Sequence, residues 1–474
     1  MDVTNPTLKP YPAYKDSGVP SLGEIPTHWE MRPLKHWVTI NKHVLPETTP
    51  PEYIFKYLDI GSVETGSLVR RPENLCFKDA PSRARRILTK GDTIISTVRT
   101  YLKAVYFVDK NETDLVASTG FAVLTPRSEV DPAFLSFLIR SNSFIDRVTA
   151  NSVGIAYPAI TETVMGGFHV AMPTSIDEQH HITAFLTHID LRVNRLIRIK
   201  RRMVALLNEQ KQAIIHRAVT RGLDPDVRLK PSGVEWLGEV PEHWEVRRAK
   251  YLFREIDHRS TTGSEVLLSL RMYQGLVPHN EVSQIPIGPD NLVGFKKVQP
   301  GQVVMNRMRA AIGLFGVASS SGLVSPDYAI FETLQPLIPE YFLYLFKTRV
   351  MGTVFRLESK GLGTGSSGFM RLYTDRFGRI TLPFPPVNEQ AAILQGIAQA
   401  TRELEQVITR TQREIDLIRE YRTRLVADVV TGKLDVRGVN LSAYGDELAG
   451  LDEALADEDD EGEEEIDEVE EDAG

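Results

Sequence analysis

Arginine and lysine recur in short clusters beside segments rich in Val, Ile, Thr and Tyr. Their permanent positive charge and donor groups suit the phosphates and base edges of DNA. Arg99 and Arg309 are the strongest candidates, because each follows a Gly-led segment typical of a strand. The candidate DNA contacts are Arg70, Arg71, Arg85, Arg86, Arg99, Tyr101 and Lys103, and then Arg271, Tyr273, Lys296, Lys297, Arg307, Arg309 and Lys360. The alternative for any one of them is an ordinary solvated surface charge.

Two loops rich in small residues accompany these clusters, at 151–158 and 360–368. Small residues would let the backbone approach DNA or let a loop become ordered on binding. A mobile surface loop without a binding role is an equally good interpretation of each.

The sequence contains no complete catalytic motif. A phosphate loop of the form GxxxxGK[ST] is absent. The stretch 325–328 (SPDY) lacks the second Pro of an adenine methyltransferase tetrapeptide, so it is interpreted as a turn before a strand. The histidines at 28, 243, 180 and 181 have no Cys or clustered acids at ligand spacing, and a packing role is favoured for His28 and His243. We therefore expect neither a catalytic site nor a metal site in this chain.

A sequence repeat must position the basic clusters. Residues 17–36 (SGVPSLGEIPTHWEMRPLKH) and 232–251 (SGVEWLGEVPEHWEVRRAKY) are identical at 12 of 20 positions. Later in each copy, Asp-Glu-Gln at 177–179 corresponds to Asn-Glu-Gln at 388–390. The chain is one unit of about 215 residues written twice. In the middle of each copy identities are sparse, as two different DNA readouts would require.

Each copy consists of a mixed segment of strands and short helices followed by one long helix. At alternating steps of four and three from Ile182 to Arg217, eight of eleven residues are apolar, and the same holds from Ile393 to Asp428. This spacing is typical of a coiled coil. We expect the two helices to pair, and an antiparallel pair would place the mixed segments at opposite ends of a rod. The alternative is that each helix packs only on its own domain.

Composition and charge agree with a DNA-binding body. The net charge is −8, but residues 446–474 hold 17 acidic and no basic residues. Without this tail, 55 basic residues against 46 acidic ones give +9. The tail has the composition of a disordered segment, which would keep the protein soluble, compete with DNA for the basic body or bind a partner subunit. Cys76 is the single cysteine, and no apolar stretch is long enough to span a membrane.

The signature Gly-Glu-Val/Ile-Pro-x-His-Trp-Glu at 23–30 and 238–245, followed by NEQ or DEQ opening a long helix, closely resembles one family. This family comprises the specificity subunits of type I restriction–modification systems, and the resemblance covers residues 17 to about 437. It implies an α+β or mixed fold, with two pseudo-symmetric α/β target recognition domains separated by two long antiparallel coiled-coil helices. The implied domains are 1–176, helix 177–221, junction and second domain 222–387, helix 388–431, and a C-terminal segment 432–474.

The resemblance also implies a function and partners. The chain would read a bipartite target in double-stranded DNA without being an enzyme itself. Two modification subunits would methylate adenine, and two restriction subunits would cleave DNA and translocate it. S-adenosylmethionine, ATP and Mg would bind to those partners, with no cofactor in this chain, in the cytoplasm of a bacterium or archaeon. The alternatives are a methylation-only complex and a coiled-coil scaffold without sequence-specific DNA binding.

Overall fold

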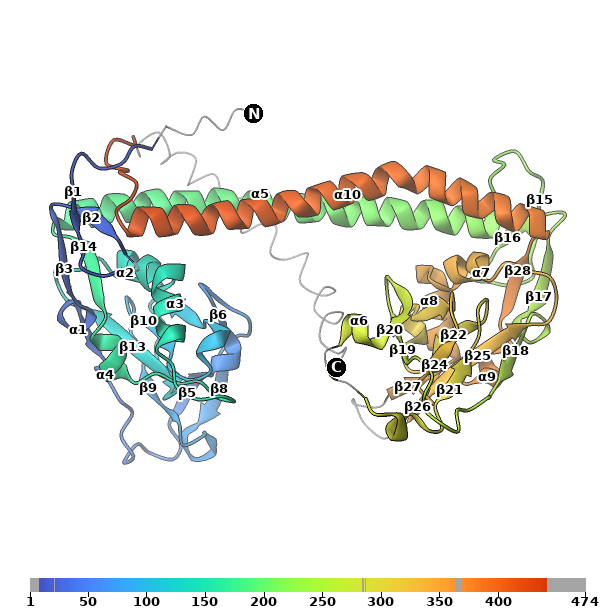
Figure 1. The fold of residues 1–474 in the computed structure, drawn as a ribbon, viewed down its shortest axis with the longest axis horizontal. Helices are drawn as coiled ribbons and strands as arrows, with labels where there is room; N and C mark the ends of the chain where they lie inside the picture. The colour runs from blue at the N-terminus through green and yellow to red at the C-terminus, as the bar shows by residue number, and fades with distance from the viewer. Residues whose placement is uncertain (1–7, 21, 284, 286, 363–368, 441–474) are drawn as a thin grey trace. The chain divides into compact units, whose positions relative to one another are not determined.

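The computed structural model describes residues 8–440 except 21, 284, 286 and 363–368 (Figure 1). The acidic tail expected from residue 446 and most of the loop at 360–368 therefore lie outside the described residues. The described chain forms two compact units. Unit 1 comprises residues up to Ile199 together with those from Glu414, and unit 2 comprises Lys200–Arg413. Each unit contains part of each long helix.

Unit 1 is built on two four-stranded sheets. One has the antiparallel order β11-β10-β13-β4, and the other has the order β8-β5-β12-β9, in which β5 and β12 run parallel. The hairpin β1-β2 and the pair β3-β14 lie beside them. The strands are β1 Tyr14–Asp16, β2 Glu24–Pro26, β3 Trp29–Pro33, β4 Val38–Ile40, β5 Ile54–Leu58, β6 Val63–Glu64, β7 Ser67–Leu68, β8 Glu73–Cys76, β9 Ala84–Ile87, β10 Thr93–Ser96, β11 Val105–Phe107, β12 Leu115–Ser118, β13 Phe121–Pro126 and β14 His169–Pro173.

Two of the four short helices of unit 1 begin with a side-chain cap. Helix α2 (Pro132–Ile139) has Pro at its first position, and the carboxylate of Asp131 accepts a hydrogen bond from Phe134 N at 2.7 Å. This local chemistry starts the helix that the sequence predicts after Pro132. The other short helices are α1 Leu34–Trp37, α3 Asn142–Ala150 and α4 Glu162–Gly166.

Unit 2 repeats one of the two four-stranded sheets of unit 1, and has two-stranded pairs in place of the other. Its sheet order β23-β22-β25-β18 matches β11-β10-β13-β4, and its pairs β15-β16 and β17-β28 match β1-β2 and β3-β14. The strands are β15 Leu229–Pro231, β16 Glu239–Pro241, β17 Glu245–Arg248, β18 Phe253–Ile256, β19 Leu268–Arg271, β20 Gly275–Pro278, β21 Lys296–Val298, β22 Val303–Asn306, β23 Phe315–Val317, β24 Gly322–Val324, β25 Tyr328–Thr333, β26 Lys360–Leu362, β27 Phe369–Arg371 and β28 Thr381–Phe384. The short helices are α6 His279–Val282, α7 Pro339–Phe346, α8 Arg349–Glu358 and α9 Thr374–Phe377.

The two long helices are α5 (Ile176–Arg221) and α10 (Val387–Val430), and they contribute to both cores. In unit 1 the start of α5 and the end of α10 pack against a core centred on Trp29 and Phe134. In unit 2 the end of α5 and the start of α10 pack against Trp244. Both long helices therefore contribute side chains to each core. Among the described residues, no helix is both long and apolar enough to cross a lipid bilayer.

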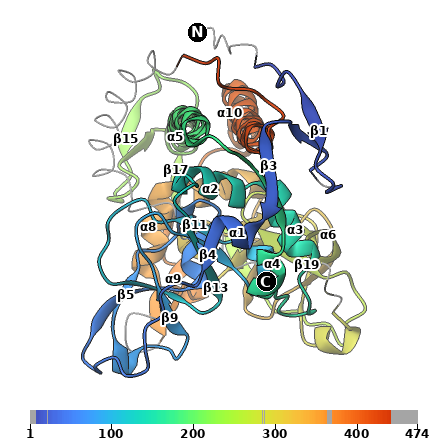
Figure 2. The same cartoon turned by 90° about the vertical axis from the view of Figure 1, so that its left-hand side faces the viewer.

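Within each unit, α5 and α10 lie side by side (Figure 2), and the residues that they pair show that they run antiparallel, as expected. In unit 1, Arg422 Nη1 donates to Asn194 Oδ1 at 3.0 Å, and Ile197 packs with Ile415. In unit 2, Lys211 Nζ lies 2.7 Å from Glu405 Oε1. Antiparallel pairing therefore holds in both units.

The packed face of α5 departs from the strict 3.5-residue seam. Leu196 and Met203 were expected in the seam but are exposed, whereas Ile197 is buried beside Val193. A straight helix turns every 3.6 residues, so its inward face drifts away from a heptad register. The sequence therefore predicted the helix correctly and part of its inward face wrongly.

Both long helices end at a glycine. Gly222 and Gly432 have φ values of +76° and +78°, a left-handed conformation that costs side-chain-bearing residues about 1 kcal/mol. A Cβ on Gly432 would lie 2.4 Å from Pro26 Cδ, so the end of α10 packs directly on the first repeat signature. A Cβ on Gly222 would lie 3.4 Å from Trp244 in the second signature.

Candidate nucleic-acid interface

The residues shared by the two repeat copies form structural anchors. In unit 1, Oε1 of Glu178 accepts hydrogen bonds from Tyr11 Oη and Trp29 Nε1, both at 3.0 Å. His28 Nε2 lies 2.9 Å from Oε2 of the same carboxylate. Burial raises the pKa of the Tyr11 hydroxyl, and the adjacent Glu178 charge raises it further. His28 and Trp29 of the signature thus hold the start of α5 against the sheets of unit 1.

Unit 2 has the equivalent contact between the signature and the start of α10, with fewer hydrogen bonds. His243 Nε2 lies 2.8 Å from Oε2 of Glu389, and the Trp244 Nε1 atom is buried without a hydrogen-bond partner in the described structure. The glutamines that follow are also equivalent. Gln179 Nε2 donates to Pro173 O at 2.9 Å, as Gln390 Nε2 does to Pro385 O at 2.8 Å. The histidines therefore have the structural role that their position beside Trp predicts.

Arg99 and Lys103 enclose a short turn of unit 1 after β10. They flank the 3₁₀ turn η3 (Thr100–Leu102), and both have φ of 52°. Arg99, Tyr101 and Lys103 are exposed, and the Arg99 guanidinium carbon lies 5.0 Å from the centre of the Tyr157 ring. Non-glycine residues in this conformation store strain and concentrate at functional sites. These predicted residues are therefore brought together on one turn.

The other basic candidates of unit 1 divide into exposed and engaged residues. Arg70 and Arg71 are exposed after β7. Arg85 lies over the Phe77 ring at 4.9 Å, and Arg86 Nη2 forms an ion pair with Glu162 at 3.2 Å. Arg86 is therefore engaged in holding unit 1 together, and Arg70 and Arg71 retain free surface.

In unit 2, Arg309 is exposed at the place equivalent to Arg99. It follows β22, directly before the 3₁₀ turn η6 (Ala310–Ile312), and its backbone N donates to Asn306 Oδ1 at 3.2 Å. Burial raises the pKa of Tyr328, while a hydrogen bond from Asn306 and the charges of Arg309 and Arg271 lower it. The buried Nε of Arg271 has no hydrogen-bond partner in the described structure.

Two basic candidates of unit 2, Lys296 and Arg307, are engaged within the protein. Lys296 is only 2 % exposed, and its Nζ donates to Tyr328 O at 2.8 Å. Arg307 forms an ion pair with Glu255, which also lies 3.5 Å from Lys296. The burial of Lys296 corrects its assignment as a DNA contact, because a buried, bonded ammonium cannot reach a phosphate without leaving the core.

Lys297 is half-exposed and paired with Glu265 at 2.8 Å. Hydrogen bonds from Lys297 and Ser260 lower the pKa of Glu265 to about 2, so the Glu265 carboxylate is charged near neutral pH. Tyr273 is 89 % exposed at the turn of the hairpin β19-β20. Lys360 is exposed at the start of β26, and the loop after it lies outside the described residues.

The fold adds residues to these surfaces that were not among the candidate contacts. Tyr157 of the loop at 151–158, which the sequence marked only by its small residues, lies against Arg99. Asn306 and Tyr328 face each other on β22 and β25. No local signal marks Asn306 and Tyr328, because their pairing arises from chain segments apart in sequence.

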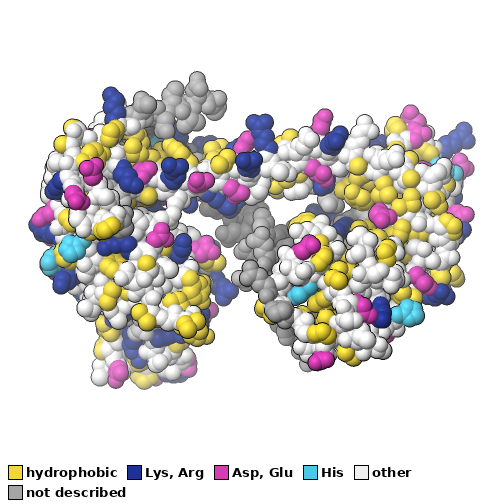
Figure 3. All heavy atoms as spheres, viewed as in Figure 1, with side chains coloured by type: hydrophobic (Ala, Val, Ile, Leu, Met, Phe, Trp, Pro, Cys, Tyr) yellow, Lys and Arg dark blue, Asp and Glu magenta, His cyan; other side chains and the backbone are white. Residues whose placement is uncertain are grey.

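Charge alone does not outline a single patch. On the face drawn in Figure 3, Lys and Arg are interspersed with Asp and Glu on both units. Pairing must therefore be judged residue by residue. Among the described residues, no group of three or more His, Cys, Asp and Glu side chains is placed to hold a metal ion.

The chain is similar over most of its length to known specificity subunits. It is 21% identical over 433 residues to the subunit assigned to the type I restriction enzyme MjaX of Methanocaldococcus jannaschii, covering 88% of this chain and 96% of the relative. It is also 21% identical over 341 residues to the MjaVIII specificity subunit of that organism, covering 69% and 76%. No protein-family model matches the chain.

The fold has a solved counterpart. A chain from a structure on complex assembly and conformational transition of the type I R-M system superposes with a TM-score of 0.63 at 20% identity, covering 86% of this chain and 99% of that one. These relatives do not favour a scaffold without DNA binding. The repeat signature, the duplicated fold and the relatives all agree that this chain is similar to the specificity subunits of type I restriction–modification systems.

Proposed function

We propose that this chain reads a bipartite DNA target for a type I restriction–modification enzyme, with unit 1 and unit 2 each reading one half. The shared architecture of the units supports two related readouts. The residues that the copies share, such as His28 and His243, serve the scaffold. The residues that differ are free to read different bases, so the two halves of the target should differ.

The observation that carries this proposal is the equivalent placement of Arg99 and Arg309. Each follows the same strand of the same sheet, β10 or β22, directly before a 3₁₀ turn. Both are exposed, and neither has an ion-pair partner among the described residues. A solvated arginine at an equivalent position in two differing units is suited to bidentate contact with guanine or to phosphate contact.

The chemistry would reside on partner subunits. Two modification subunits would bind S-adenosylmethionine and methylate adenine, and two restriction subunits would use ATP and Mg to translocate and cleave DNA. The helices α5 and α10 would set the number of unread base pairs between the halves. This assembly would act on DNA in the cytoplasm of a bacterial or archaeal cell.

Methylome sequencing tests the proposal directly. The chain is expressed with its modification partner in a host lacking other DNA methyltransferases, as wild type, Arg99→Ala and Arg309→Ala. The wild type should produce one split motif with N6-methyladenine in both halves. Each variant should relax or lose one half only, since a base contact contributes about 1–3 kcal/mol of discrimination.

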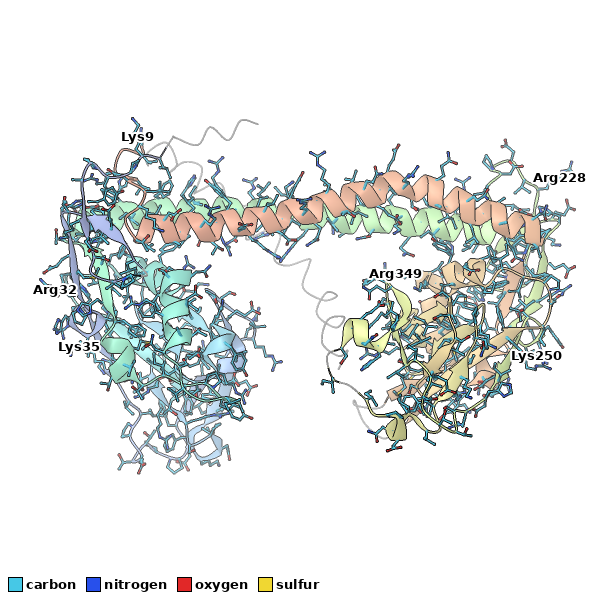
Figure 4. All side chains as sticks on the ribbon, viewed as in Figure 1. Lys9, Arg32, Lys35, Arg228, Lys250 and Arg349 are labelled. Carbon is cyan, nitrogen blue, oxygen red and sulfur yellow. The ribbon has the colours of Figure 1, made fainter. Side chains whose placement is uncertain are left out.

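Matched controls come from the repeat itself. Lys35 and Lys250 occupy equivalent positions of the two signatures, and both are exposed (Figure 4). Lys35→Ala and Lys250→Ala should leave the motif unchanged. A wild-type complex with active methyltransferase and no modified motif would overturn the proposal in favour of a scaffold.

A further inference from the structure

The loop at residues 151–159 of unit 1 is firmly folded against the turn η3. Val153 and Ala159 exchange two backbone hydrogen bonds, of 2.8 and 3.0 Å, which close the loop into a narrow hairpin. Thr100 Oγ1 donates to Ser152 Oγ at 2.8 Å, and Ile160 N donates to the carbonyl of Thr97 at 2.8 Å. The base of the loop is thus anchored to the segment that carries Arg99.

The tip of this anchored loop presents apolar side chains to solvent. Ile155 is fully exposed, and Val153 and Tyr157 are mostly exposed. Tyr101 and Leu102 of the adjoining turn are also exposed. Single exposed apolar residues are common, but a cluster held out by a hydrogen-bonded loop is typical of a binding surface.

The charges around this cluster indicate a polyanionic partner. Residues 97–104 and 151–160 include two cations, Arg99 and Lys103, and no Asp or Glu. Arg147, in the preceding helix, donates instead to the carbonyl of His169. The Arg99 guanidinium carbon lies 5.0 Å from the Tyr157 ring centre, so the aromatic ring holds the cation at the edge of the cluster. Lys103 keeps a left-handed backbone at the place where unit 2 has Gly313. A lysine is strained in this left-handed conformation and a glycine is not, so the presence of Lys103 favours a role for its charge.

We propose that the loop 151–159 enters a groove of the first half-site as an apolar wedge, with Ile155 and Tyr157 against the bases, Arg99 beside them at a base edge and Lys103 on a flanking phosphate. This inference rests on the proposed function and names how unit 1 reads DNA. Apolar side chains inserted at a base step partly unstack it, and flexible pyrimidine–purine steps yield most readily. The first half-site should therefore contain such a step at the wedge.

The wedge and the charge contacts differ in their salt dependence. Each lysine or arginine on a phosphate releases counterions, whereas an apolar contact releases none. The complex of this chain with its modification partner is measured on DNA bearing the methylated motif, at several salt concentrations. Ile155→Ser should weaken binding by about 5- to 100-fold and leave the salt slope unchanged, while Lys103→Gln should reduce the slope by about one.

Unstacking is observed separately with 2-aminopurine at each step of the first half-site in turn. Wild-type complex should raise the fluorescence at one step, and Ile155→Ser should abolish the rise. Ile54→Ser is the matched control, since Ile54 is an exposed isoleucine on β5 of the same unit. It should change neither affinity nor fluorescence.

The outcomes separate this inference from the proposed function. Suppose that the wild type produces a methylated motif, and that Ile155→Ser has the affinity and the 2-aminopurine fluorescence of the wild type. This result overturns the wedge and leaves DNA reading intact. Failure of Ile155→Ser to assemble with the modification partner would show that the loop is a protein contact, which also overturns it. Absence of any motif in the wild type overturns the proposed function itself.

Discussion

His28 and Glu178 are joined through their side chains, Nε2 to Oε2 at 2.9 Å, and His243 and Glu389 repeat the pair at 2.8 Å. The two pairs differ in what else the carboxylate holds. Glu178 also accepts hydrogen bonds from the buried donors of Tyr11 and Trp29. The same sequence signature therefore supports a larger network in unit 1 than in unit 2.

Glu178→Ala should destabilise unit 1 more than Glu389→Ala destabilises unit 2. It would leave two buried donors without an acceptor, at about 1–3 kcal/mol each, whereas Glu389→Ala frees only the half-exposed His243. Hydrogen exchange of peptides from each unit measures the two losses independently. Equal losses would contradict a larger network around Glu178.

Lys103→Gly should stabilise unit 1 and weaken DNA binding. Glycine adopts the left-handed φ of 52° without strain, which stabilises the folded state. Its greater freedom in the unfolded chain offsets part of this effect, so the free energy of unfolding should rise by roughly 0.5 kcal/mol. Thermal unfolding and DNA affinity are measured together. The reciprocal control, Gly313→Ala, should destabilise unit 2, because its φ is +79° and a Cβ there would lie 3.3 Å from Lys347 Cα. Stabilisation of unit 2 by Gly313→Ala would refute this account of the turn.

Gly432→Ala should loosen the junction between the end of α10 and the first signature. A Cβ would meet Pro26 Cδ at 2.4 Å, and the positive φ adds strain, so we expect a loss of about 2 kcal/mol or more in unit 1. Protease cleavage near residues 430–440 should accelerate. Gly438→Ala is the control, because a Cβ there meets no atom within 4 Å. Equal cleavage of both variants would count against the contact.

His216 on α5 should make unit 2 less stable in mild acid. Burial lowers its pKa, and the nearby Arg221 charge lowers it further. The unfolded state then binds more protons than the folded state, so the stability is complete above the ordinary histidine pKa of about 6.5 and is lost as pH falls through the lowered value.

His216→Gln carries no titrating group and should therefore lose less stability than the wild type between pH 8 and pH 5.5. Hydrogen exchange of α5 peptides from unit 2 reports the difference, with unit 1 peptides as the internal reference. An identical loss in both proteins would assign the acid sensitivity to other groups.

The sequence by itself determined the duplicated plan. The signatures at 17–36 and 232–251 and the two long apolar periodicities are local patterns, and they encode contacts that both copies must make. That is why the two units and the helices α5 and α10 could be inferred before the structure. The middle of the helix seam was mispredicted, because the inward face of a helix depends on what packs against it.

Only the tertiary structure decided which basic residues are available to DNA. Lys296 and Arg309 belong to equally plausible clusters, yet Lys296 is buried against β25 and Arg309 is exposed. Tyr157 joins Arg99 from 58 residues away in the sequence. The burial and pairing of a basic side chain depend on neighbours that folding brings together. The two recognition segments share few identical residues, so no repeated pattern in the sequence indicated those neighbours.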